Sequence, residues 1–291
     1  NELQLPDNGS YTSFYDIGGP YIVWNVMAAP EFELEAKTWC FPVAGCVAYR
    51  GYFEQTRAER YAAELVAEGY DVYVGGVAAY STLGRFKDPI LSSMLAYSDE
   101  HFTGLLIHEL AHQRLYVKGD TAFNEGFATF VEQAGLVRWR LARGLPAGES
   151  GEALKAQRLA VLRLLEETRA QLVDLYASDG PDQERRQAKS AAIDQLRQRY
   201  RQLMNEHRNR GLTARPYERL IMGELNNASL LAVATYQDLV PAFAVLEADC
   251  ARVLPCVYER AEQLAGLGAE ERAEAVDRLL QRAEQGAGRA L

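Results

Sequence analysis

The chain has 291 residues, of which 48% are hydrophobic and 24% are charged, a balance typical of a protein that buries a sizeable core. This composition excludes disordered, collagen-like and small disulfide-scaffold proteins. The formal net charge of -9 argues against a nucleic-acid partner, because such proteins need a broad basic face.

The first part of the chain predicts a small sheet with one helix. Two runs, Tyr21–Met27 and Tyr70–Tyr80, carry the β-branched and aromatic residues that are typical of strands. Between them, Arg57–Glu68 has the amphipathic spacing of a helix. Gly75 and Gly76 interrupt the second strand and indicate either a bulge or a close approach of the backbone to another group.

The rest of the chain predicts helices almost throughout. We expect consecutive helices at Asp99–Tyr116 and Thr121–Arg143, and three or four more in Thr213–Leu291. Between these regions, residues 152–209 are rich in Leu, Ala, Arg, Gln and Glu, and a break at Ser178–Pro181 predicts a helical hairpin. Apolar residues recur at coiled-coil-like spacing along both arms, namely Leu154, Val161, Leu165 and Leu172, then Ile193, Leu196, Tyr200 and Leu203.

Two of the four histidines stand in one short motif, HELAH at residues 108–112. On a helix, residues i and i+4 lie on one face a turn apart, so the imidazoles of His108 and His112 point toward the same place. This spacing suits two zinc–nitrogen bonds, and Glu109 lies beside them, within reach of a water molecule at the metal. The alternative is a helix with two buried, hydrogen-bonded histidines.

A third ligand is expected from residues 124–132, which read NEGFATFVE. A catalytic zinc takes three protein ligands and keeps one open position, and Glu125 can fold back from the next helix toward the two histidines. Asn124 is a candidate N-cap for that helix or a neighbour of its start. Glu132, two turns further along the same face, is a candidate to orient a ligand histidine. Without a metal, Glu125 is a helix N-terminal charge and Glu132 a solvated residue.

The other two histidines are not expected to bind metal. His207 continues the apolar repeat of the hairpin, which predicts a histidine packed between its helices. His101 precedes the HELAH motif and is expected at the surface or in a helix cap.

The motifs HELAHQ and NEGFATFVE resemble the gluzincin metallopeptidases, particularly the zinc aminopeptidases related to membrane alanyl aminopeptidase. The resemblance implies that His108, His112 and Glu125 bind one zinc ion per chain. It also implies that Glu109 is the general base and proton shuttle, and that Glu132 supports a ligand. One departure is that only twelve residues separate His112 from Glu125, fewer than in those aminopeptidases.

The chain is also similar to a bacterial family of "putative aminopeptidases", predicted zinc peptidases that share this shorter spacing. Three further segments carry the similarity, which covers most of the chain: Trp39–Phe53, Ala79–Pro89 and Leu225–Leu230. The similarity implies a zinc-dependent aminopeptidase.

The resemblance also implies a residue that stabilises the oxyanion of the tetrahedral intermediate. Aminopeptidases of this group use a tyrosine that follows the third ligand. We favour Tyr236, because a phenol is an unusual core residue on its apolar helix. Tyr217 and Tyr80 are rivals for this function.

The stretch Gly75–Gly84 precedes the HELAH motif by about the interval at which gluzincins place a substrate-pairing edge strand. Peptide addition to such an edge would explain its two glycines, and makes Gly76 and Tyr80 candidate substrate-binding residues. The chain lacks the Gly-x-Met-Glu-Asn sequence whose glutamate holds the substrate's free amine in alanyl-type aminopeptidases. The carboxylates that can replace that glutamate are Asp88, Asp99, Glu100 and Asp120, and the sequence does not choose among them.

The four cysteines form two local pairs with equal spacing, Cys40 with Cys46 and Cys250 with Cys256. Local disulfides are the simplest of three connectivities and favour an oxidising compartment, whereas the alternative is four buried, reduced thiols. We expect a processed bacterial protein that is periplasmic or exported. Uninterrupted apolar runs such as Leu230–Ala234 are far shorter than the ~18 residues of a membrane span, so no transmembrane segment is expected.

These elements predict a mainly helical α+β fold. A small antiparallel sheet is expected to pack on the HExxH helices within residues 1–150, the catalytic core. Residues 151–212 are expected to form a helical-hairpin insertion, and residues 213–291 a helical C-terminal part that completes the catalytic unit.

The leading interpretation is a zinc peptidase in which Glu109 takes a proton from a metal-activated water. A second is a zinc-containing module that binds a peptide or a protein partner without turnover, with the hairpin as its docking surface. A third is an esterase or amidase that uses the same zinc chemistry.

Overall fold

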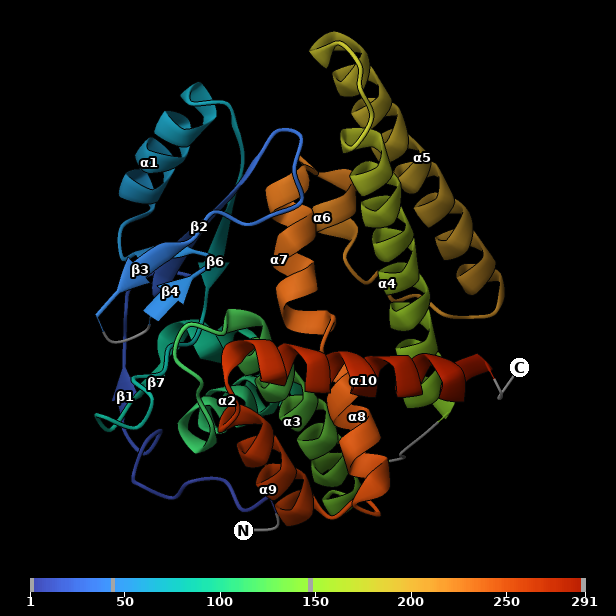
Figure 1. The fold of residues 1–291 in the computed structure, drawn as a ribbon. Coiled ribbons are helices and arrows are strands. Elements are labelled where there is room, and N and C mark those ends of the chain that lie inside the picture. The colour runs from blue at the N-terminus through green and yellow to red at the C-terminus, as the bar shows by residue number, and fades with distance from the viewer. Residues whose placement is uncertain (1–2, 43–44, 146–148, 289–291) are drawn as a thin grey trace.

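The computed structural model describes residues 3–42, 45–145 and 149–288, and it has the mainly helical α+β architecture expected from the sequence (Figure 1). The strands are β1 (Phe14–Tyr15), β2 (Val23–Pro30), β3 (Trp39–Phe41), β4 (Gly45–Val47), β5 (Arg50–Tyr52), β6 (Tyr70–Val77) and β7 (Ile90–Leu91). The helices are α1 (Gln55–Ala67), α2 (Asp99–Arg114), α3 (Thr121–Ala142), α4 (Glu149–Tyr176), α5 (Asp182–Asn209), α6 (Glu218–Met222), α7 (Asn227–Gln237), α8 (Val240–Asp249), α9 (Leu254–Ala265) and α10 (Ala269–Gly288).

The main sheet has three antiparallel strands in the order β5-β2-β6, so β6 lies at an edge. Helices α1 and α7 make its main helix contacts, and Figure 1 shows α2 and α3 below it. Helix α1 buries Ala58, Ala62 and Leu65 against the strands, because these positions recur every three or four residues on one helical face.

The two glycines in β6 mark a close approach and not a bulge. The ladder with β2 continues through both, since Asn25 pairs with Gly75 and Trp24 with Gly76. A side chain at Gly76 would collide with the ring of Tyr21. One of the two readings of these glycines is therefore confirmed.

Helices α2 and α3 pack side by side, and the C-terminal helices α8, α9 and α10 complete their core. Helices α2 and α3 start at the predicted residues, and they end one or two residues before the predicted ends. The centre of this core is aromatic, with ring pairs among Phe123, Phe127, Phe130, Phe243 and Tyr258.

Helices α4 and α5 form the predicted hairpin, which extends away from the rest of the molecule in Figure 1. Its interior holds the predicted repeat, although Leu203 is only partly buried and Met204 takes a core position beside it. The side chain of Leu154 lies outside the described residues. This core continues into α6 and α7 through Ile221, Leu225 and Leu230, so the hairpin shares its interior with the C-terminal part.

The C-terminal part contains five helices within its described residues, where three or four were predicted. Helix α6 has only five residues, too short for a clear periodic signal. Helices α7 and α8 form one apolar stretch in sequence, but the helical structure is interrupted between them at Asp238 and Leu239. Helix α8 carries a proline in its first turn. Proline is tolerated there because the first turn leaves its N–H groups unpaired.

Both local disulfides are present in the structure, and no free cysteine occurs among the described residues. Cys40 and Cys46 are directly opposite each other in the β3–β4 hairpin. Cys250 and Cys256 join the end of α8 to α9. The predicted pairing is confirmed.

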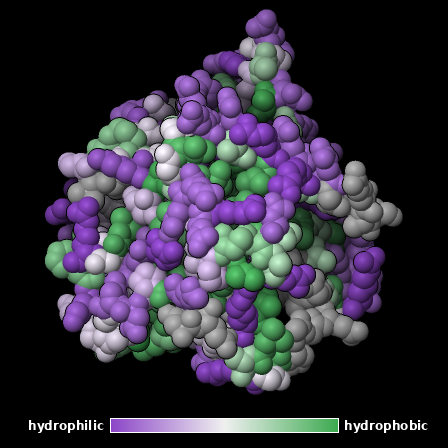
Figure 2. All heavy atoms as spheres, turned by 60° about the horizontal axis from the view of Figure 1, so that its bottom comes forward, coloured by the Kyte–Doolittle hydropathy of each residue, from purple (hydrophilic) through white to green (hydrophobic). Residues whose placement is uncertain are grey.

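One described segment, Asn227–Asp249, is long and apolar enough to cross a membrane by length and composition. It comprises α7 and α8, of which α7 packs on the sheet and on α3. A core helix of a folded protein passes the same test, so the segment is weak evidence for a membrane span. The short uninterrupted apolar runs in the sequence do not mark this segment, because polar residues interrupt it. On the face shown in Figure 2, hydrophobic residues form small patches separated by hydrophilic ones.

Candidate metal centre

The turn between α2 and α3 sets the position of the third predicted ligand. Gly119 has a φ of +81°, which favours glycine, and the side chain of Asp120 caps α3 by accepting from the N–H of Phe123 at 3.0 Å. The N-cap is therefore Asp120 and not Asn124. Asn124 is buried inside the first turn, where its amide bonds both the N–H and the carbonyl of Val117, at 2.7 and 2.8 Å.

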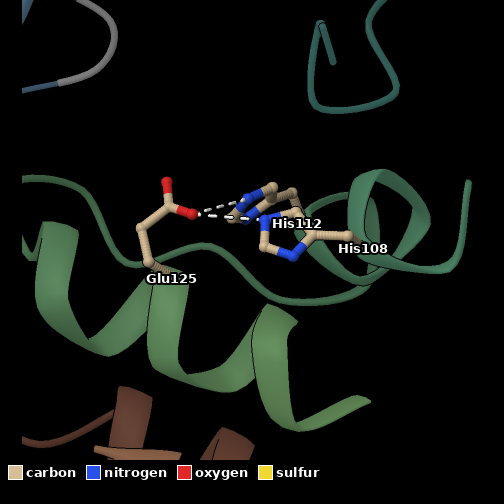
Figure 3. A group of neighbouring side chains, drawn as sticks. All are labelled: His108, His112 and Glu125. Atoms are coloured by element: carbon tan, nitrogen blue, oxygen red, sulfur yellow. Dashed lines mark hydrogen bonds and ion pairs between the residues drawn. The ribbon is translucent and has the colours of Figure 1, made fainter. Parts of the chain in front are cut away.

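Three side chains from these two helices converge on one point (Figure 3). The Oε2 atom of Glu125 lies 3.2 Å from Nε2 of His108 and 3.5 Å from Nε2 of His112. All three candidate donor atoms lie within 4.8 Å of one another. Four tetrahedral bonds of ~2.1 Å separate neighbouring donors by about 3.4 Å, so the two measured separations suit a shared metal ion.

Glu132 lies on the other side of the first histidine. Its Oε2 is 3.2 Å from Nδ1 of His108, while Nε2 of the same ring faces Glu125. The carboxylate thus fixes which ring nitrogen is free to bind a metal. Gly104, one turn before His108, makes room for it, because a Cβ there would lie 3.0 Å from Oε1 of Glu132.

The charges of the cluster act strongly on one another. Burial by itself lowers the pKa of His108, but hydrogen bonds with Glu125 and Glu132 outweigh it and raise the pKa to about 10. Burial raises the pKa of Glu125, yet His112 and His108 overcome this and bring it well below its usual range. The negative field that favours a proton on His108 also favours a cation between these residues.

Glu109 is buried beside the cluster and accepts no hydrogen bond from any described residue. Burial raises the pKa of its carboxyl, with a further contribution from the negative charge of Glu125. A carboxylate with a raised pKa and free oxygens is suited to accept and return a proton.

The structure separates the three tyrosines proposed for the oxyanion. The ring of Tyr236 lies 6.3 Å from that of His108, centroid to centroid, and the charge of Glu125 together with burial raises its pKa well above the ordinary value. Tyr80 is about half exposed. Tyr217 is partly buried against the core of the hairpin, where Arg158 donates to its hydroxyl at 3.1 Å, so it is not at the centre.

Sequence reasoning missed three further tyrosines near these residues. The carboxylate of Glu125 contributes to the raised pKa of Tyr49 and of Tyr116, and that of Glu109 to the raised pKa of Tyr11. In all three tyrosines, burial is the largest cause. Tyr11 and Tyr49 come from loops far from the motif in sequence, and no periodic pattern marks them.

The predicted substrate strand is β6, an edge strand with a partly accessible backbone. The side-chain amide of Asn226 donates to the backbone carbonyl of Val72 at 2.9 Å, so the backbone N–H and C=O groups of Val72 point away from β2. Because strand residues alternate, the N–H and C=O groups of Val74 and Gly76 also point to this outer edge. The side-chain face of Gly76 is filled by Tyr21, so only its backbone can meet a peptide.

Three of the four candidate amine-binding carboxylates have other partners. Asp99 is exposed and lies 3.9 Å from Arg143, and Glu100 pairs with Arg140. Asp120 caps α3 and pairs with Arg272 at 2.8 Å. Of the other two histidines, His101 is exposed and contacts Tyr97. His207 is buried in the hairpin as predicted, but its Nδ1 has no hydrogen-bond partner among the described residues.

Comparison with known proteins gives one match. A family model described as "Putative aminopeptidase" matches residues 1–276. Searches among curated proteins and among solved structures find no match.

Proposed function

The chain belongs to the "Putative aminopeptidase" family, and on that premise we propose that it is a zinc-dependent peptidase of gluzincin type that cleaves residues from the amino termini of peptides. The observation that carries the proposal is the convergence of His108, His112 and Glu125 from two helices. Two imidazoles and one carboxylate are the ligand set of many catalytic zinc sites. If these residues held a metal only for structural support, the buried carboxylate of Glu109, which accepts no hydrogen bond from the described residues, would have no function beside them.

Zinc, when bound, would supply Lewis-acid chemistry that polarises the scissile carbonyl and makes water more acidic. Glu109 takes the proton of the attacking water and delivers it to the leaving amine. Tyr236 donates its hydroxyl hydrogen to the developing oxyanion, since its raised pKa keeps the phenol protonated. Glu132 holds His108 in the orientation and tautomer that metal binding requires.

The substrate backbone would extend along the outer edge of β6. A peptide there would form main-chain hydrogen bonds with Val74 and Gly76, and such bonds do not depend on the sequence of the peptide. This mode binds a peptide independently of its side chains and favours a peptidase over an esterase of small, non-peptide substrates. Tyr80 follows the strand and is about half exposed, which supports its proposed contact with the substrate.

We also propose that the protein works in an oxidising compartment, the periplasm or outside the cell. Two disulfides support this location, because cytosolic thiols are kept reduced.

The test of the mechanism is Glu109→Gln in zinc-loaded protein. Gln keeps the size of the side chain but cannot accept the proton, so kcat on a library of free peptides should fall by ~100-fold or more, while the metal content stays at one zinc per chain. The matched control is Glu100→Gln on the same helix, whose side chain pairs with Arg140 at the surface, and its kcat should stay at the wild-type value.

Two outcomes would count against the proposal. Full turnover by zinc-loaded Glu109→Gln would exclude the base assigned here. A zinc-loaded wild-type chain that cleaves no peptide in the library would instead indicate a zinc-containing binding module.

A further inference from the structure

The loop between β6 and β7 carries a buried carboxylate that the proposed mechanism does not use. Asp88 is 4% exposed. Its Oδ2 accepts from the N–H of Thr82 at 2.9 Å and from Nε2 of Gln113 at 3.3 Å, and both donors are neutral. No ion pair of Asp88 occurs among the described residues. Buried carboxylates are ordinarily paired with a cation, and none of the described side chains provides one to Asp88.

Gln113 places this carboxylate beside the metal centre. It follows His112 directly and lies one helical turn after Glu109, so Glu109 and Gln113 share a face of α2. Because Gln113 holds Asp88, the aspartate lies on the side of the helix where Glu109 points.

Residues 8–11, near the amino terminus, hold Gln113 and Asp88 in place. Asn8 donates to Oε1 of Gln113 at 2.8 Å, and Nε2 of Gln113 also donates to the hydroxyl of Ser10 at 3.3 Å. The backbone N–H of Tyr11 donates to the carbonyl of Asp88 at 2.5 Å. Oδ1 of Asp88 keeps no hydrogen-bond partner among the described residues and is the atom available to a ligand.

The position of the loop decides which part of a substrate would reach Asp88. Strand β6 runs from Tyr70 to Val77, and the loop with Asp88 begins at its carboxyl end. A peptide added antiparallel to β6 points its amino terminus toward that end. Its α-ammonium group would then bring a positive charge to the buried carboxylate of Asp88.

We propose that Asp88 binds the free α-ammonium group of the substrate and so restricts the protein to aminopeptidase activity, with Gln113 as the residue that positions it. This inference rests on the proposed function, because it concerns the substrate of the same centre. Of the four carboxylates that the sequence left open, Asp88 is the one without a cationic partner in the described structure.

The test is a binding measurement that needs no turnover. Zinc-loaded protein is titrated calorimetrically with leucine hydroxamate and with 4-methylpentanohydroxamic acid, the same compound without its amine. Both can chelate the metal, so their affinity ratio isolates the ammonium group. The wild type should bind leucine hydroxamate about 10- to 100-fold more tightly, as expected for a hydrogen bond to a charged group.

The informative variant is Asp88→Asn, which keeps an oxygen acceptor for Thr82 and Gln113 and removes the charge. The preference for leucine hydroxamate should vanish, while the affinity for 4-methylpentanohydroxamic acid stays within about twofold of the wild type. The matched control is Asp99→Asn, an exposed aspartate, which should keep the full preference.

The outcomes separate this inference from the proposed function. Equal affinity of the wild type for the two hydroxamates, or a preference that survives in Asp88→Asn, overturns the assignment of Asp88 and leaves the zinc peptidase standing. Weakened binding of both compounds in Asp88→Asn assigns the residue a structural function only. Failure of both compounds to bind zinc-loaded wild type overturns the peptidase proposal together with the inference.

Discussion

At the scale of single residues, the candidate centre depends on how one imidazole is held. His108 lies between two carboxylates, with Glu125 at one ring nitrogen and Glu132 at the other. Such a partner fixes the ring orientation before a metal arrives and makes the free nitrogen a better ligand. Gly104 belongs to the same arrangement, because a Cβ at this position would lie 3.0 Å from Oε1 of Glu132 and would push that carboxylate from its place.

The residue-scale prediction concerns Glu132→Ala. His108 loses the bond at Nδ1, so zinc affinity should fall about 10- to 100-fold, measured by competition with a chromogenic chelator. Gln133→Ala, the next position on α3, is the control, because Gln133 makes no hydrogen bond among the described residues. An unchanged zinc affinity in Glu132→Ala would show that Glu132 does not support the ligand.

At the scale of elements, the short connection between α2 and α3 brings the third donor to the first two. Asn124 closes this turn from inside by bonding both backbone groups of Val117. The β3–β4 hairpin covers it from outside, since Lys118 donates to the carbonyl of Pro42 at 2.8 Å and a Cβ at Gly45 would collide with the backbone of Gly119. The turn is therefore held on two sides, and Glu125 follows it directly.

The element-scale prediction concerns Asn124→Ala. The N–H of Val117 would lose its partner inside the protein, whereas its carbonyl would keep the bond from the N–H of Asp120 at 3.2 Å. One unpaired buried group costs about 1–3 kcal/mol. The free energy of unfolding in urea should drop by about 1–3 kcal/mol. Asn205→Ala on the exposed face of α5 is the control and should change it by less than about 0.5 kcal/mol. A similar small change in Asn124→Ala would refute the importance of this clamp.

At the scale of the whole molecule, the sheet, the hairpin and α7 meet at one polar junction. Lys189 of α5 is buried and bonds Asp71 of β6 at 2.6 Å and the carbonyl of Glu31 at 2.8 Å. The same carboxylate accepts from the N–H of Asn227 at 2.8 Å, and the Asn227 amide reaches the carbonyls of Pro30, Glu31 and Glu33. The hairpin is thus joined to the strand that we propose binds substrate.

The prediction at this scale concerns Lys189→Ala. It leaves Asp71 without its cation, and breaking a buried pair costs about 3–5 kcal/mol, which urea unfolding measures. Arg186→Ala, one turn away, is the control, because Arg186 is about half exposed and pairs with Glu31 at the surface. Its loss should be much smaller, because solvent screens an exposed ion pair. Equal losses in the two variants would argue that this junction does not hold the hairpin.

Local patterns were enough to predict the helices of the centre and the three side chains that converge there. The four-residue spacing of His108 and His112 places both imidazoles on one face whatever the rest of the chain does. Glu125 followed from the need for a third donor near the start of the next helix. The helical hairpin and the local disulfides were predictable for the same reason, since the signals lie within a few turns of the chain.

Only the tertiary structure distinguished between chemically equivalent residues. Four carboxylates were open to bind an amine, and three of them turned out to have cationic partners while Asp88 is buried without one. Tyr217 proved to pack against the hairpin core, and the charges of Glu109 and Glu125 proved to contribute to the raised pKa values of Tyr11 and Tyr49, which burial raises most. Burial and pairing depend on contacts between segments far apart in the chain, which no local periodicity records. The sparse histidines marked where the centre is, and the packing around them decides what it can bind.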